Sequence, residues 1–329
     1  HIFQLGIKST LIAIGIIMII VLNKKSLYRE FLLRGLDGPI KFDSQELIEY
    51  IRNEVLDPPS NKAYNLNYGE IKVPITLPDG HQTLRLMQSM VFYDNAIKYL
   101  FPHKHGGWFV EAGALDGESV SNTLYLEKDM GWTGLFLVEV DERKYKTLLQ
   151  KHRKAWSANV CLATHPYPSK ELFILRDIES AAMGTLASHD QRVHMTNGSS
   201  VMSSTFTSVQ CLPLSSILTA LKVRHIDLLS LDVEGAELDI LNTLDFSLFT
   251  IDVLFLEVLS NKNIEDQHKE VVTVMERRGF TLFLSLEIDY IFIRTASKYH
   301  RIVLEQGPIM YDVETDSIKL KGNVTNQAK

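Results

Sequence analysis

The stretch that decides the fold is Phe109-Val-Glu-Ala-Gly-Ala-Leu-Asp-Gly-Glu-Ser-Val-Ser-Asn-Thr-Leu-Tyr-Leu-Glu127. Its first residues are apolar and predict a short buried strand. Gly113 and Gly117 follow in a turn, and the apolar spacing then predicts a helix that begins near Ser119 or Ser121. A glycine turn before a helix lets a ligand approach the backbone closely and offers it unpaired N–H groups.

The spacing Glu111-x-Gly113-x-x-x-Gly117 differs from that of dinucleotide binders, and by itself it fits a turn that binds nothing. The next strand favours a ligand, because the apolar run 134–138 ends on Glu139. An acidic residue at this strand tip hydrogen-bonds a ribose in doubly wound sheets. With no phosphate to balance, we predict a pocket for S-adenosylmethionine (AdoMet). Glu139 would hold the ribose, while Glu111 and the glycine turn would face the amino-acid part.

A second acidic cluster follows another apolar run, Ile226-Asp-Leu-Leu-Ser-Leu231. Asp232, Glu234 and Glu237 lie within six positions of one another. In an open α/β sheet, ligands bind at this carboxyl edge of the strands. Asp232 and Glu234, as two close carboxylates, could polarise an acceptor hydroxyl or bind a cation. Glu237 would fall in a first helical turn, where an anion is favoured for structural reasons as well.

From residue 107 onward, predicted strands and helices alternate, which favours right-handed βαβ units. The predicted fold class is α/β, a Rossmann-like, mainly parallel sheet with helices on both faces. Residues 280–284 and 290–294 are expected to pair as antiparallel strands. Residues 178–206 show no period and are predicted to be a mobile lid or a substrate loop.

The composition describes a globular chain of 329 residues, with 45% hydrophobic and 22% charged residues. Its formal net charge is −6 and it has no tract rich in lysine or arginine, which argues against a nucleic-acid partner. No histidine or cysteine cluster has zinc spacing, and no oxygen-rich loop stands out. No metal site is predicted.

The N-terminal region carries an unbroken apolar run, residues 11–22, between Lys8 and the pair Lys24 and Lys25. Such a run predicts either a short membrane-spanning helix or the core of a cleaved signal peptide. Because no cleavage site follows it, we favour an uncleaved single-pass anchor over residues 1–25, in contact with membrane lipid.

The side of the membrane on which the large domain lies is open. Basic residues after the apolar run favour the cytosol. Two sequons, at Asn197 and Asn323, favour the lumen. Cys161 and Cys211 would be buried thiols in the cytosol; in a lumenal domain we predict a disulfide at one sheet edge.

The chain also resembles a known family. Three segments carry the resemblance: 109–127, Leu137-Val-Glu-Val140 and Ser230-Leu-Asp-Val-Glu-Gly-Ala-Glu237. They are similar to the FkbM-type methyltransferase domain. Within that family, Gly117-Glu-Ser-Val-Ser-Asn-Thr-Leu124 and Gly131-Trp-Thr-Gly-Leu135 are most similar to the arthropod Star-like membrane proteins.

The resemblance implies an AdoMet-dependent fold and, for ordinary members, methyl transfer to oxygen, often on sugars. It assigns cofactor binding to a set of residues in the first two segments: Glu111, Gly113, Asp116, Gly117 and Glu139. It maps the later acidic motif to Asp232, Glu234 and Glu237. Ordinary members carry lysine where this chain has Ser230. The chain therefore lacks a charge that is expected to position the acceptor.

Two functions follow, with different expectations for partner and location. A Star-like protein would bind a transmembrane growth-factor-like cargo and act in its trafficking through the endoplasmic reticulum, Golgi and endosomes. The alternative is an active, membrane-anchored O-methyltransferase with a glycan or other hydroxyl acceptor. The predicted organisation has four parts: an anchor over 1–25, a linker and helical extension over 26–80, the methyltransferase-like domain over 81–295, and a C-terminal extension over 296–329.

Overall fold

The computed structural model describes residues 36–67, 72–76, 82–86, 88–178, 181–189, 203–259, 262–306, 309–313, 315 and 317–320. The expected anchor and both sequons lie outside these ranges. Among the residues inside them, no helix is both long and apolar enough to cross a membrane. The anchor and the glycosylation sites therefore stay predictions.

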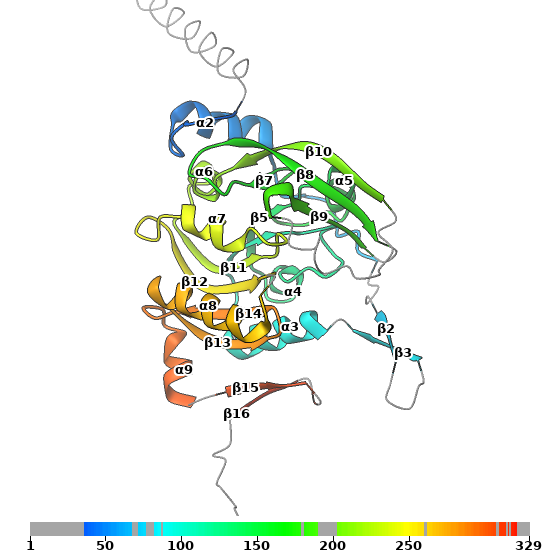
Figure 1. The fold of residues 1–329 in the computed structure, drawn as a ribbon, viewed down its shortest axis with the longest axis vertical. Coiled ribbons are helices and arrows are strands. Elements are labelled where there is room, and N and C mark those ends of the chain that lie inside the picture. Colours follow the sequence, from blue (N-terminus) through cyan, green and yellow to red (C-terminus); the bar gives the residue numbers. More distant parts are fainter. Residues whose placement is uncertain are drawn as a thin grey trace, which may run out of the picture.

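The centre of the molecule is an eight-stranded sheet with the spatial order β1-β6-β5-β4-β11-β12-β14-β13 (Figure 1). In that order the strands span Leu56–Asp57, Ser157–Ala158, Thr133–Val138, Trp108–Ala112, His225–Leu231, Thr250–Glu257, Asp289–Arg294 and Phe280–Leu286. The strands from β6 to β12 run parallel, whereas β14 is antiparallel to both of its neighbours. The predicted mainly parallel sheet and its antiparallel closing pair are confirmed.

The strand order reverses direction at β4. From β4 the chain proceeds outward through β5 and β6, and it later returns to lay β11 against the other side of β4. Such a reversal is the topological switch point at which open α/β sheets bind ligands. The candidate site should therefore lie at the carboxyl ends of β4 and β11.

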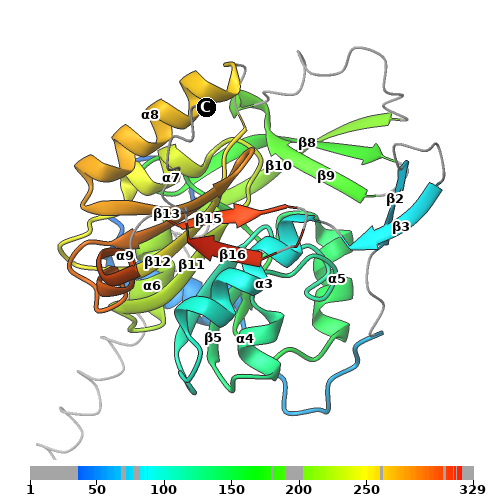
Figure 2. The ribbon, with the colours of Figure 1, turned by 90° about the horizontal axis from the view of Figure 1, so that it is seen from below.

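Helices cover both faces of the sheet (Figure 2). One face packs against α2 (Gln45–Tyr50), α6 (Leu214–Ala220), α7 (Glu237–Thr243) and α8 (Ile264–Arg277). The other face packs against α3 (Gln88–Leu100), α4 (Leu124–Lys128) and α5 (Glu142–Gln150). Because β11 and β12 are covered on both faces, they are apolar along almost their whole length rather than alternating.

A second sheet of four strands has the order β7-β10-β8-β9 and forms a separate layer (Figure 1). Its strands span Cys161–Leu162, Ser203–Leu212, Ser169–Ile178 and Ala181–Leu186. Part of the segment expected to be a loop, 178–206, is therefore strand, although residues 190–202 lie outside the described ranges. Strands β7 and β10 are parallel, with Cys161 and Cys211 opposite each other.

The two cysteines form a disulfide, with their Cα atoms 4.4 Å apart. This confirms that they meet at one sheet edge. The bridge joins residues separated by 50 positions and closes the excursion that contains β8 and β9. It joins β7 to β10 within the second sheet, and β7 begins three residues after the end of β6.

Both extensions contribute to the domain. Residues 45–57 supply α2, the π-helix Ile51–Val55 and the edge strand β1; Leu47 and Ile51 are fully buried in the core. At the other end, α9 (His300–Gln306) precedes a hairpin of β15 (Ile309–Asp312) and β16 (Ser317–Leu320). Tyr311 of this hairpin packs into the hydrophobic core on the sheet face that carries α3, α4 and α5. A further hairpin joins β2 (Lys72–Thr76) to β3 (Gln82–Leu86).

Candidate functional site

The predicted site segments converge at the carboxyl edge of the central sheet. The N–H groups of Gly113 and Ala114 donate to the carbonyl of Val138, and the N–H of Asp232 donates to the carbonyl of Ala112. These bonds join the ends of β4, β5 and β11. The glycine turn, the acid after β5 and the acidic cluster after β11 are therefore neighbours, as the topology requires.

Gly113 is required by the approach of two backbones. Its φ is +87°, and a Cβ atom there would lie 1.8 Å from the carbonyl oxygen of Asp232. Any other residue would push the turn away from β11. At Gly117, φ is +76° and a Cβ atom would lie 2.9 Å from Cγ of Leu148. The glycines thus place the turn against the protein itself, in addition to the ligand access expected from the sequence.

Glu139 lies at the tip of β5, half-buried, with its carboxylate facing the glycine turn. One oxygen accepts from the N–H of Leu115 at 2.8 Å and the other from the N–H of Asp141 at 2.7 Å. Burial raises the pKa of Glu139 to about 7, although these hydrogen bonds partly offset it. A carboxylate has about four acceptor positions, and the backbone N–H groups of Leu115, Asp141 and Val140 act on this one, so capacity for a ribose hydroxyl remains.

Glu111 serves the loop that follows the glycine turn. Its oxygens accept from the N–H of Asn122 at 2.6 Å, the hydroxyl of Ser121 at 2.9 Å and the hydroxyl of Thr123 at 2.6 Å. Burial raises the pKa of Glu111, and the nearby Arg153 guanidinium opposes that rise. Because both oxygens accept hydrogen bonds from residues 121–123, Glu111 holds this part of the loop in place.

The hydrogen bonds that Glu111 accepts from residues 121–123 change the expected local structure. The sequence predicts a helix from Ser119 or Ser121, but α4 begins only at Leu124. Asp116 also holds the loop, because its carboxylate accepts from the N–H groups of Glu118 and Ser119 and from the Ser119 hydroxyl. The N–H of Asn122 donates to the Glu111 carboxylate, so that group is engaged within the protein.

Two cations that the sequence analysis did not identify neutralise the acids around this loop. Arg153 forms an ion pair with Glu127 at 3.1 Å and donates to the carbonyl of Gly117 at 2.5 Å. Lys151 forms an ion pair with Glu118 at 2.6 Å. We call this set the compensated group: Glu111, Glu118, Glu127, Lys151 and Arg153.

A different set of carboxylates surrounds Asp232. The carboxylate oxygens of Asp232, Glu234 and Glu257 lie within 4.8 Å of one another. Glu237 is buried beneath their turn, and its Oε1 accepts from the N–H groups of Val233 and Gly235. Asp289, opposite Glu257 on β14, accepts from the hydroxyl of Tyr93 at 2.8 Å. We call this set the acidic group: Asp232, Glu234, Glu237, Glu257 and Asp289.

Three members of the acidic group have raised pKa values. Burial raises the pKa of Asp232 well above its usual range, and the charges of Glu257, Glu237 and Asp289 raise it further. A hydrogen bond between the Asp232 and Glu257 carboxyl groups requires a proton on one of them. Burial likewise raises the pKa of Glu237 and of Asp289 to about 7. Within the described part of the chain, no lysine or arginine forms an ion pair with Asp232, Glu237 or Asp289.

Sequence reasoning missed Glu257, Asp289 and Tyr93 as members of the site. Glu257 had a readable signal, because it ends the apolar run of β12 beside β11. Asp289 begins an antiparallel strand, so its position at the same edge depends on the strand order. Tyr93 comes from α3 and stacks on Phe255 with ring centroids 4.6 Å apart. No motif marks it.

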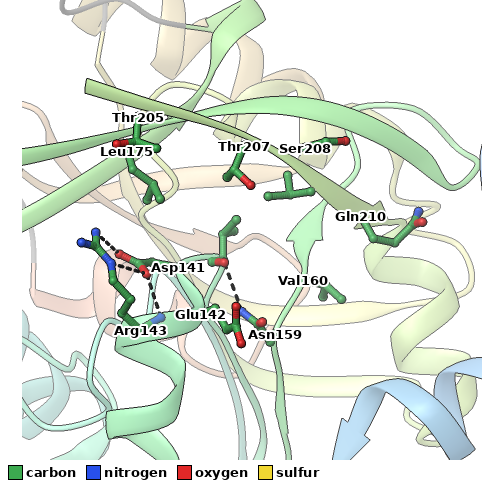
Figure 3. A pocket seen from close by; sticks show the side chains of 12 residues that line it. Asp141, Glu142, Arg143, Asn159, Val160, Leu175, Thr205, Thr207, Ser208 and Gln210 are labelled. Atoms are coloured by element: carbon green, nitrogen blue, oxygen red, sulfur yellow. Dashed lines mark hydrogen bonds and ion pairs between the residues drawn. The ribbon is translucent and has the colours of Figure 1, made fainter. Parts of the chain in front are cut away.

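A cavity of 470 Å³ adjoins the strand tip that carries Glu139 (Figure 3). Asp141, Glu142 and Asn159 line one side, and Thr205, Thr207 and Leu175 line the side provided by the second sheet. Asn159 donates to the carbonyls of Glu139 and Val140, which fixes the strand tip. The cavity lies next to the predicted ribose acid and has both polar and apolar side chains in its walls.

The comparison with protein families then decides the assignment. Residues 111–282, more than half of the chain, match the model of the methyltransferase FkbM domain. The chain belongs to this family. The match begins on Glu111 and contains the seven residues first predicted to form the site. No curated protein sequence matches the chain, so the Star-like relationship stays a proposal.

Two solved structures are similar to parts of this one. The fibrillarin/Nop5p complex matches with a TM-score of 0.36 and 15% identity, covering 70% of this chain and 90% of that chain. TrmK of M. capricolum, in complex with S-adenosylhomocysteine, matches with a TM-score of 0.27 and 8% identity, covering 60% and 66%. At these scores the fold assignment depends on the strand order and the family match.

AdoMet is the cofactor of this methyltransferase domain, and the residues present fit it. Glu139 has acceptor capacity left for a ribose, and polar side chains line part of the cavity at its strand tip. The acidic group is joined to the glycine turn through the backbone of Asp232. Ser230, at the position of the family's lysine, is buried, lies in register with Glu111 and accepts from Asn122.

Proposed function

We propose that this protein transfers a methyl group from AdoMet to a hydroxyl oxygen of its acceptor, with Asp232 and Glu234 contacting that hydroxyl. One observation carries the proposal: the acidic group is joined to the glycine turn by the Asp232–Ala112 backbone hydrogen bond, beside the predicted cofactor pocket. An acceptor bound against these carboxylates would lie within reach of the methyl group.

When bound, AdoMet supplies a methyl group on a cationic sulfur, which keeps the electron pair of the broken bond as a neutral thioether. The chain's own residues position the acceptor and receive its proton. An ionised carboxylate of the Asp232–Glu234 pair accepts a hydrogen bond from the hydroxyl and takes the proton as the new oxygen–methyl bond forms. Positioning supplies much of the rate, so a strong base is unnecessary.

The test is release of S-adenosylhomocysteine by the purified chain in the presence of hydroxyl acceptors, with oligosaccharides first. The double variant Asp232→Asn, Glu234→Gln should lower the rate by about a hundredfold or more while AdoMet still binds. Glu270→Gln serves as the control, because Glu270 is an exposed acid of α8 that pairs with Lys262 and does not line the cavity. Turnover by the double variant at the unmutated rate would refute the assignment of these residues.

A second candidate function is supported by the disulfide. Disulfides persist in oxidising compartments, and this one closes a long excursion of the domain. Together with the apolar run 11–22, it favours a Star-like, single-pass protein of the endoplasmic reticulum, Golgi, late endosome and plasma membrane. There the domain would act as a scaffold in the export of a transmembrane growth-factor-like cargo.

Cargo secretion from cells separates the two functions. If the protein is an anchored scaffold, deleting residues 1–25 should abolish secretion, whereas Asp232→Asn with Glu234→Gln should leave it unchanged. If it acts as an enzyme, the double variant should behave like a deletion of the whole protein. A soluble truncation that fully restores secretion would refute the anchored function.

A further inference from the structure

Residues 113–120, which comprise the glycine turn and the start of the loop after it, have a strained backbone. Besides the two glycines, Leu115 and Val120 adopt left-handed conformations, with φ of +50° and +53°. This region is uncommon for residues that carry a Cβ atom, and a β-branched residue such as Val120 is an outlier there. Such strain persists only where the surrounding structure holds the backbone in place. The contacts that hold these residues therefore bear on cofactor binding.

The segment that follows α5 holds the turn through two side chains. The Arg153 guanidinium donates to the carbonyl of Gly117 at 2.5 Å, and Lys151 forms its ion pair with Glu118 at 2.6 Å. The side chains of Arg153, Lys151 and Glu118 are only 2%, 6% and 9% exposed. Because they are shielded from water, these contacts restrain the turn more firmly than surface ion pairs would.

A part of the N-terminal extension lies along the same segment. We call residues 60–67 the strap. The N–H of Ser60 donates to the carbonyl of Arg153 at 3.0 Å, and the N–H of Asn65 donates to the carbonyl of Lys151 at 3.1 Å. The strap therefore runs antiparallel to residues 151–153. Lys151 and Arg153 bind the strap with their backbones and the turn with their side chains.

The strap also contacts the turn directly. The N–H of Asn67 donates to Oε2 of Glu118 at 3.0 Å, and the same oxygen pairs with Lys151. The strap, the segment after α5 and the turn thus meet at a single carboxylate oxygen. The strap lies N-terminal to residues 111–282, which match the family model. It is a feature of this chain outside the matched domain.

Polar contacts provide much of what holds the strap. Lys154 donates to the carbonyls of Ser60 and Lys62, and its Nζ lies 4.8 Å from the centre of the Tyr64 ring. None of residues 60–67 is buried. Segments with little buried apolar surface and exposed hydrogen bonds open locally at a low free energy. A change in the turn should therefore be measurable as a change in how often the strap opens.

We propose that the strap positions the glycine turn for AdoMet, with Asn67 and Lys151 acting through Glu118. These are positioning residues, because they hold the turn and not the cofactor. Coupling between two sites is reciprocal, so a strap that favours the AdoMet-binding turn must itself be held more tightly when AdoMet binds. The proposal rests on the cofactor site of the proposed function and is independent of the acceptor.

The experiment is amide hydrogen exchange of the purified full chain, with and without saturating AdoMet and without any acceptor. The N–H groups of Ser60, Asn65 and Asn67 should exchange about fivefold or more slowly when AdoMet is bound. The hairpin of β15 and β16 is the control, because it is a peripheral element built from the C-terminal extension. Its exchange should change by less than about twofold.

A variant tests the coupling from the side of the strap. Lys154→Met removes the side-chain contacts with the strap and leaves those of Lys151 and Arg153 with the turn. It should raise the Kd of AdoMet about fivefold or more, whereas Lys262→Met, at an exposed lysine, should leave it within about twofold. Thermal melting checks folding. If Lys154→Met fails to fold, Asn65→Ala replaces it, because the Asn65 amide donates to the carbonyl of Gln150 at 3.0 Å.

The outcomes separate this inference from the proposed reaction. Equal exchange of the strap in the free and AdoMet-bound chain overturns the positioning role and leaves methyl transfer standing. Unchanged AdoMet affinity in a Lys154→Met variant whose strap exchanges faster has the same meaning. Absence of AdoMet binding by the unmutated chain overturns the strap and the cofactor site together. Conversely, a strap that AdoMet protects, in a chain that methylates no hydroxyl, keeps the positioning role and loses the proposed reaction.

Discussion

Two groups of buried or half-buried carboxylates lie near the glycine turn, and their surroundings differ. In the compensated group, Arg153 and Lys151 pair with Glu127 and Glu118, and three donors from the loop satisfy Glu111. In the acidic group, burial and neighbouring carboxylates instead raise the pKa of Asp232. The ion pairs of the compensated group hold a loop in place. Strongly perturbed pKa values such as that of Asp232 are typical of functional sites.

The largest expected effect is on stability. Arg153→Met should lower the free energy of unfolding by about 3–5 kcal/mol, because it leaves Glu111 and Glu127 buried without their cation. Asp232→Asn, a neutral isostere in the acidic group, should be neutral or stabilising near neutral pH. Urea unfolding of both variants measures the contrast. Equal losses in the two variants would mean that the groups do not differ as described.

The disulfide should have the next largest effect. Cys161→Ser with Cys211→Ser should lower the free energy of unfolding by about 2–4 kcal/mol, because the bridge closes a long loop of the unfolded chain. It also joins β7 to the strand that lines the cavity beside Glu139. We therefore expect weaker AdoMet binding in the variant, and the same weakening in the unmutated chain under reductant. A reductant effect that persists in the double variant would have another origin.

A smaller effect, on the pH dependence of stability, is expected at Glu139. Glu139 accepts two backbone N–H groups, and burial still raises its pKa to about 7 from an ordinary 4.5. A raised folded-state pKa means that the folded protein binds the proton more tightly. Its contribution to stability is therefore present below pH 4.5 and is lost as the pH rises through about 7. Glu139→Gln should remove about 1–3 kcal/mol of that pH dependence, measured by urea unfolding.

Strand ends were predictable from sequence, whereas partners across the fold were not. Asp232 and Glu139 each follow an apolar run, so their positions at the sheet edge could be read directly. The late start of α4 could not, because it depends on Glu111 binding Ser121, Asn122 and Thr123 through the folded loop. Local apolar spacing alone extends the helix too early.

The remaining site residues required the strand order. Asp289 reaches the acidic group because β14 inserts, antiparallel, between β12 and β13. Arg153 follows α5 and is buried against Glu127, although a lone arginine in a polar turn gives no sequence signal. The second sheet was missed because β10 carries serine and threonine at positions typical of loops, and its partner β8 supplies the apolar side chains.

The most direct test of the account is a calorimetric titration of AdoMet into the purified chain. It should compare the unmutated protein, Glu139→Ala and the control Glu270→Ala, since Glu270 is an exposed acid of α8 that pairs with Lys262 and does not line the cavity. The account predicts saturable binding that Glu139→Ala weakens by about 1–3 kcal/mol and Glu270→Ala leaves unchanged. No binding by the unmutated chain, or equal affinity in Glu139→Ala, would contradict it.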